Sequence, residues 1–113
     1  MNILEINEKD LISDNSIKLL GNEMVFDSLK LKKSKHFVGI RPEHLKANQK
    51  TQFTFNPEIE LIENLGNEKI AYMKKDEYQL SAKIPSNVEI SNSIGFDLKD
   101  IFVFDQNGKR VKS

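Results

Sequence analysis

Apolar and polar residues alternate with a period of two through much of this chain. In residues 78–84 (YQLSAKI), four apolar side chains fall on one face of an extended strand, namely Tyr78, Leu80, Ala82 and Ile84. Residues 58–63 (EIELIE) alternate in the same way, with Ile59 and Leu61 set against glutamates. The pattern continues at two further pairs, Ile70 with Tyr72 and Phe96 with Leu98. This period is typical of half-buried antiparallel strands.

Turn signals separate these runs at short spacing. The dipeptide Asn107-Gly108 is the strongest hairpin signal, and a looser loop is expected over residues 85–93. Three further turns are predicted, at Gly21-Asn22, Gly66-Asn67 and Asp76-Glu77. Residues 101–105 (IFVFD) are apolar on both faces, as for a central or barrel strand. Seven or eight short strands therefore predict an all-β fold, a small antiparallel barrel or sandwich.

Helical patterning is confined to residues 42–50 (PEHLKANQK). Proline suits the first position of a helix, and Glu43 suits its first turn. The segment is long enough for one or two turns, so one short helical turn is expected beside the strands.

The composition fits one soluble domain and excludes several functions. The 113 residues carry 17 Lys and Arg against 17 Asp and Glu, so no net charge steers the chain toward nucleic acid or an anionic membrane. The absence of cysteine excludes disulfides, thiolate zinc sites and cysteine nucleophiles. We expect neither a signal peptide at the N-terminus nor a membrane span, because no apolar run is long enough.

Catalytic and metal-binding patterns are weak. Only His36 and His44 could serve as imidazole bases, and no nucleophile elbow accompanies them. Their spacing of eight residues matches neither a helical histidine pair nor a zinc ribbon. No phosphate-binding glycine motif occurs. We therefore expect no catalytic residue, no metal site and no cofactor site in these residues.

The basic run over residues 29–36 (LKLKKSKH) raises the possibility of nucleic-acid binding. Small β-barrels of the OB type bind oligonucleotides through basic grooves and stacking aromatic residues. No exposed aromatic series accompanies this run, so a solvated loop or an edge strand is the better interpretation.

The stretch over residues 36–46 (HFVGIRPEHLK) predicts a structural corner. Gly39 inside a strand indicates a bend or a close approach of another segment. Arg41 ends the strand, because Pro42 removes a backbone donor from the ladder. The guanidinium of Arg41 is suited to a bidentate ion pair with a carboxylate such as Glu43 or Glu63.

Several segments together resemble one protein family. The motif VGIRPEHL over residues 38–45 looks like a signature near the C-terminus of ATP-binding subunits of ABC importers, especially the carbohydrate-importer ATPases typified by the maltose system. Residues 59–74 (IELIENLGNEKIAYMK) and 94–111 (IGFDLKDIFVFDQNGKRV) resemble two later segments of that family, and the opening MNILE resembles the seam after its nucleotide-binding domain. The similarity covers nearly the whole chain in order.

The resemblance implies a single C-terminal domain over residues 1–113, of the OB-like β-barrel type called TOBE, without its nucleotide-binding domain. Such a domain has a regulatory and dimerisation role and no enzymatic activity, whereas the parent subunit binds ATP and Mg²⁺. The implied partners are its own nucleotide-binding domain, a homodimer partner and, through the parent, the permease subunits, with no nucleic acid and no direct membrane insertion. The implied location is cytoplasmic and peripheral at the inner face of the plasma membrane.

The family-like positions are structural or interface residues rather than catalytic ones. They are Gly39, Arg41, Pro42, Glu43, His44, Glu63, Gly66, Phe104 and Asp105. Residues 63–72 look closest to the carbohydrate branch, so sugars are the expected solutes. The chain departs from the family where a histidine usually precedes the Leu-Phe-Asp triplet, because Phe102 stands there. Two alternatives remain, a stand-alone barrel that binds a small ligand such as an oxyanion or a sugar, and an OB-type nucleic-acid binder.

Overall fold

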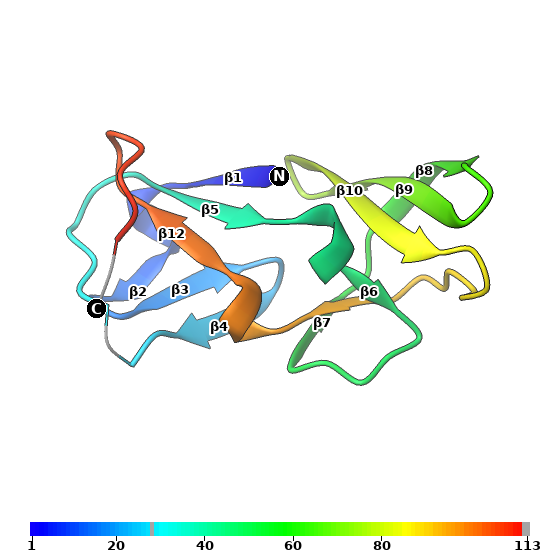
Figure 1. Ribbon diagram of the computed structural model, residues 1–113. Helices are drawn as coiled ribbons and strands as arrows, with labels where there is room; N and C mark the ends of the chain where they lie inside the picture. The colour runs from blue at the N-terminus through cyan, green and yellow to red at the C-terminus, as the bar shows by residue number, and fades with distance from the viewer. Residues whose placement is uncertain (28, 112–113) are drawn as a thin grey trace.

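Short strands and single turns of 3-10 helix make up the computed structural model, which describes residues 1–27 and 29–111 (Figure 1). Twelve strands and three 3-10 turns occur in these residues, and no α-helix is found among them. The all-β class predicted from the alternation is therefore confirmed. In the described ranges no helix is long and apolar enough to cross a membrane.

The strands form four antiparallel sheets of three strands each. Two sheets lie at one end of the molecule (Figure 1), and we call them the β5 half: β1 (Asn2–Ile6), β5 (His36–Ile40) and β12 (Phe102–Phe104) in the order β1-β5-β12, and β2 (Leu11–Ser13), β3 (Ser16–Leu19) and β4 (Asn22–Val25) in the order β2-β3-β4. The other two form the β9 half: β10 (Tyr78–Pro85), β9 (Glu68–Lys75) and β8 (Glu58–Asn64) in the order β10-β9-β8, and β6 (Lys46–Ala47), β11 (Ile94–Phe96) and β7 (Phe53–Phe55) in the order β6-β11-β7.

The molecule is elongated, with principal extents of 43 × 24 × 21 Å. Strand ladders among the described residues do not join the four sheets into one closed ring. The closed OB-like barrel therefore stays a prediction, although every sheet is antiparallel as expected.

The alternation in residues 78–84 predicts the burial of β10 correctly. Leu80, Ala82 and Ile84 are buried, whereas Gln79 and Lys83 are exposed. Aromatic rings pack together in the β6-β11-β7 sheet of the β9 half. The ring centroid of Phe96 lies 5.5 Å from that of Phe53 and 6.0 Å from that of Phe55. Such pairs add packing energy beyond the burial of their area.

The side chains predicted to be buried in β9 and in the second part of β8 are not the ones that are buried. Ala71 and Met73 of β9 are buried, and Tyr72 between them is exposed. In β8 the register shifts between Ile59 and Leu61, which marks a β-bulge. Because an extra residue at a bulge moves the following side chains to opposite faces, Leu61 points to solvent instead of sharing the buried face with Ile59.

The predicted turns are present, one of them displaced. Asp76-Glu77 links β9 to β10, and Gly66 at φ +93° lies in the turn between β8 and β9. The turn between β3 and β4 is formed by Leu20 and Gly21, at φ +52° and +80°, one residue earlier than predicted. A buried leucine in the left-handed region is unusual, and burial of its side chain offsets the strain.

The short helical turn expected within residues 42–50 is present and occupies only the first three of them. Only η2 (Pro42–His44) forms, as a single 3-10 turn, and β6 follows at once. Lys46 and Ala47 pair with Gly95 and Ile94 of β11. Pairing with another strand and burial of Ala47 outweigh the weak helical propensity of so short a segment. Two further 3-10 turns, η1 (Glu8–Asp10) and η3 (Leu98–Asp100), were not predicted.

Side chains connect the two halves where β1 meets β10. The amide of Asn2 donates to the carbonyl oxygens of Ile40 (3.1 Å) and Ser81 (2.9 Å), and its Oδ1 accepts the backbone N–H of Ser81 (2.8 Å). The hydroxyl of Tyr78 donates to the carbonyl oxygen of Glu5 (2.8 Å). We call these contacts the β1–β10 seam.

Candidate functional site

The outer face of the β1-β5-β12 sheet gathers part of the predicted set. Gly39 of the central strand β5 lies opposite Ile3 of β1 and Phe102 of β12. A Cβ atom on Gly39 would come within 2.5 Å of Met1 Sδ and 3.0 Å of Phe104 Cε2. The close approach predicted at this glycine is therefore confirmed. β12, predicted as a central or barrel strand, is the last named strand of its sheet, and its other side is bonded to the chain after the hairpin, where the N–H of Val111 donates to the carbonyl oxygen of Val103 (2.8 Å).

Arg41 does not form the ion pair predicted from the sequence. Among the described residues its guanidinium has no salt bridge to Glu43 or Glu63. It lies instead over the ring of Phe102, 5.7 Å from the centroid, and Arg110 approaches the same ring at 4.7 Å. Attraction between the guanidinium and an aromatic face thus takes the place of the expected ion pair. Of the two carboxylates considered, Glu63 lies in β8, in the β9 half, whereas Glu43 lies in η2 close to Arg41 without a salt bridge to it.

Pro42, Glu43 and His44 form η2, which turns the chain so that Leu45 is fully buried. A hydrogen bond with its own backbone lowers the pKa of Glu43, and the nearby charges of His44 and Arg41 act in the same direction. His44 Nδ1 lies 3.8 Å from Asp100 Oδ1 of η3. Sequence reasoning missed this contact, because 56 positions separate the two residues and no motif links them.

Glu63 and Gly66 lie on the β8–β9 hairpin, apart from the corner residues. Glu63 is exposed, and the hydroxyl of Tyr72 lies 3.5 Å from its Oε1. Gly66 donates its N–H to the side-chain oxygen of Asn64 (3.0 Å) and holds the hairpin turn. The structure therefore divides the predicted set into a corner group on β5, η2 and β12 and a hairpin group on β8 and β9.

Asp105 organises the hairpin after β12. Its Oδ1 accepts the backbone N–H groups of Asn107 (2.9 Å) and Lys109 (2.9 Å), and Gly108 adopts φ +81°. Phe104 pairs with Arg110 across this turn. The hairpin predicted at Asn107-Gly108 is thus confirmed, with an aspartate cap of the kind that stabilises turns.

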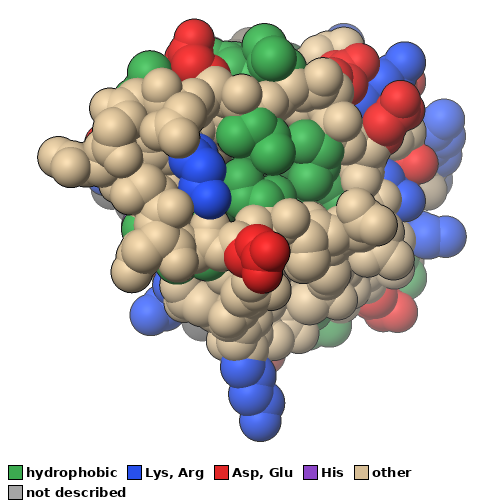
Figure 2. Space-filling view, turned by 90° about the vertical axis from the view of Figure 1, so that its right-hand side faces the viewer, with side chains coloured by type: hydrophobic (Ala, Val, Ile, Leu, Met, Phe, Trp, Pro, Cys, Tyr) green, Lys and Arg blue, Asp and Glu red, His purple; other side chains and the backbone are tan. Residues whose placement is uncertain are grey.

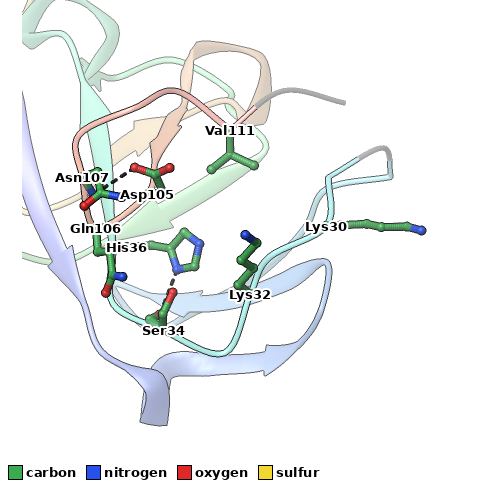
Figure 3. Close-up of a pocket in the computed structure, with 8 residues that line it drawn as sticks. All are labelled: Lys30, Lys32, Ser34, His36, Asp105, Gln106, Asn107 and Val111. Atoms are coloured by element: carbon green, nitrogen blue, oxygen red, sulfur yellow. Dashed lines mark hydrogen bonds between the residues drawn. The ribbon is translucent and has the colours of Figure 1, made fainter.

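A cavity of about 230 Å³ lies beside this hairpin (Figure 3). The residues that line it are Lys30, Lys32, Ser34, His36, Asp105, Gln106, Asn107 and Val111. The side chain of His36 is almost fully buried, with 2% of the residue exposed, and its Nδ1 donates to the carbonyl oxygen of Ser34 (2.8 Å). In Figure 3 the other ring nitrogen of His36 faces the side of the cavity where the Lys32 side chain lies.

The lining of the cavity combines lysine, histidine and amide groups with one carboxylate. A buried imidazole nitrogen and the Lys32 ammonium would contact an oxygen-rich ligand from two sides. No serine or threonine hydroxyl is hydrogen-bonded to His36 in the described residues, as a nucleophile would require. In the sequence, the basic run over residues 29–36 was the one indication of this cavity, and residues 29–35 form a loop. That the run and Asp105 line the same cavity depends on the fold.

No cluster of three His, Asp or Glu side chains suited to a metal ion occurs in residues 1–27 and 29–111. No protein-family model matches the chain, and a search of curated proteins found none that matches it.

Proposed function

We propose that this chain is the regulatory and dimerisation domain of the ATP-binding subunit of an ABC importer, with sugars as the transported solutes. One observation carries the proposal: three of the segments that resemble that family lie side by side in one sheet. The MNILE segment provides β1, the VGIR segment provides β5 and the FVF segment provides β12. Segments that are distant in sequence and meet in space are expected when a family pattern reflects a shared fold.

In this proposal the domain performs no chemistry. ATP and Mg²⁺ are bound by the nucleotide-binding domain of the parent subunit, and this domain contributes surface area that keeps two such subunits paired at the cytoplasmic face of the membrane. A protein or ligand that binds it more tightly in one state of the dimer would shift the balance between open and closed states.

The proposal is tested on the protein in its own cell. An epitope tag is added after the codon for Ser113 in the chromosome, and the tagged polypeptide is isolated from detergent-treated membranes and identified by mass spectrometry. We expect a polypeptide that also contains a nucleotide-binding domain and that is recovered with permease subunits. A polypeptide of only 13.0 kDa plus the mass of the tag, recovered without an ATPase or a permease, would contradict the proposal, as would ATP hydrolysis by the purified 113 residues.

The His36 cavity favours one second candidate, a binding site for a small oxyanion. Lys32 and His36 supply the positive charge and the hydrogen-bonding nitrogen, while the carboxylate of Asp105 already accepts two backbone N–H groups. Calorimetric titration of the purified chain with phosphate, and separately with maltose, tests this candidate. Phosphate binding that Lys32→Ala removes and Lys33→Ala retains would support it, because Lys33 lines a different hollow. Binding of neither probe would eliminate it.

A further inference from the structure

The two edges of the β10-β9-β8 sheet differ in what covers them. At the β10 edge, the N–H and carbonyl of Ser81 are bonded to the side chain of Asn2. At the β8 edge, no hydrogen bond from another described segment reaches the strand. β8 is seven residues long, about 23 Å of strand at ~3.3 Å per residue.

The direction of the free backbone groups follows from the ladder. Because Ser81 turns its N–H and carbonyl away from β9, its partner Tyr72 turns those groups toward β8. Leu61, which pairs with Tyr72, then faces β9. Alternation along the strand directs the N–H and carbonyl of Ile62 outward, to the free edge. Such groups are a template for pairing with another strand.

Exposed apolar side chains flank this edge on both faces. Ile62 lies opposite the buried Ala71, so it is on the core face of the sheet, yet 46% of it is exposed. Leu61, on the outer face, is 59% exposed, and Leu65 in the following turn is also exposed. Figure 2, which views the molecule from the end where the β8–β9 hairpin lies, shows hydrophobic side chains gathered in a hollow with charged side chains around it. Contiguous apolar surface of this kind marks interaction sites.

The charges along the strand are all negative. Glu58, Glu60 and Glu63 are exposed, and none has a salt bridge within the part of the chain that the structure describes. A second copy of β8 placed against this edge would bring two sets of glutamates together, which is unfavourable. A strand that carries lysine or arginine would be attracted instead.

We propose that β8 is a docking edge for an extended polypeptide segment in which apolar residues alternate with lysine or arginine. The backbone of that segment would bond to the free N–H and carbonyl groups of β8, as in β-strand addition. Its apolar side chains would pack against Ile62 on one face, and its basic side chains would face Glu58 and Glu63 on the other. This proposal does not rest on the importer function proposed above.

The first test uses a synthetic nine-residue peptide of alternating lysine and valine, labelled with fluorescein, and a glutamate–valine peptide of the same length as its control. We expect the basic peptide to bind with an anisotropy change and to shift the amide NMR signals of residues 58–64 more than those of residues 78–85. The proposal is overturned by equal binding of the two peptides, by shifts confined to other segments, or by a concentration-dependent dimer of the chain formed through β8.

Matched variants then locate the interaction. Ile62→Lys should weaken binding of the basic peptide about tenfold, because one apolar contact is lost and a like charge is introduced. The control Ile12→Lys, at a similarly exposed isoleucine of β2, should leave binding unchanged. The double variant Glu58→Lys with Glu63→Lys should lose the basic peptide and gain the glutamate–valine peptide, whereas Glu23→Lys on β4 should do neither. Failure of this exchange of partner, in a variant whose far-ultraviolet circular dichroism is unchanged, would overturn the proposal.

Discussion

β10 and β8 flank the same strand, β9, and are of similar length, yet one outer edge is covered and the other is open. At β10, Asn2 and Tyr78 form the β1–β10 seam, which closes the edge with side chains rather than a backbone ladder. At β8, within residues 1–27 and 29–111, a bulge and three glutamates are the features that oppose strand pairing. The difference indicates that the β10 edge serves stability and that the β8 edge is free for binding. Substitutions of the same residue type at the two edges test this contrast.

The largest difference is expected between two leucines. Leu80→Ala on β10 should lower the free energy of unfolding by about 3 kcal/mol, because it leaves a cavity in the core. Leu61→Ala on β8 should change it by no more than ~0.5 kcal/mol, because that side chain is mostly exposed. Urea denaturation followed by circular dichroism measures both. Equal losses would mean that β8 is packed as tightly as β10.

Two asparagines give the next largest difference. Asn2→Ala leaves the backbone groups of Ser81 and the carbonyl of Ile40 without their partner and should cost about 2 kcal/mol. Asn64→Ala at the end of β8 removes one exposed bond to Gly66 and should cost less than ~1 kcal/mol. The same urea titrations measure both, and an Asn2→Ala chain as stable as the wild type would show that the seam adds nothing.

A smaller difference in stability is expected between variants of the two tyrosines, Tyr78 of β10 and Tyr72 of β9. Tyr78→Phe removes the hydrogen bond to Glu5 and should cost about 1 kcal/mol. Tyr72→Phe, whose hydroxyl lies 3.5 Å from an exposed carboxylate, should cost less than ~0.5 kcal/mol. Thermal unfolding of the two variants at one pH separates these values. The reverse order would place the stabilising tyrosine on the open side of the sheet.

Tyr78 also gives the stability of the protein a dependence on pH. Burial, followed by the negative charges of Asp10, Glu77, Asp76 and Glu5, raises the pKa of Tyr78 from 10.0 to about 12. The folded state therefore holds this proton more tightly than the unfolded state, so the contribution to stability is complete below pH 10 and is lost as the pH rises toward 12. Absorbance titration of phenolate in the Tyr72→Phe variant reports Tyr78 alone, and a midpoint near 10 would contradict this account.

Sequence reasoning succeeded where one local signal decides the structure. The alternation with a period of two predicted the buried face of β10, and Asn107-Gly108 predicted the hairpin after β12. Neighbouring residues determine both features. It failed where a distant segment decides. The bulge in β8 and the pairing of Ala47 with β11 depend on partners that the local pattern does not contain, as does the position of Arg41 over Phe102.

The candidate sites follow the same division. Gly39 could be recognised as a point of close approach, because a glycine within a strand often marks a place where another segment comes near the backbone. The His36 cavity and the open edge of β8 could not be predicted, since each depends on residues brought together by the fold. In the cavity, the loop over residues 29–35 meets the hairpin at Asp105, about seventy positions later.

The β1–β10 seam also bears on how the chain reaches its native state. Asn2 and Ser81 are 79 positions apart, so the contact closes a loop that spans most of the molecule. Contacts of such long range slow folding, because chain entropy is lost before the interaction is gained. During synthesis on the ribosome, β1 would leave the exit tunnel long before residue 81. We therefore expect β1 to be among the last of the described strands to complete its contacts.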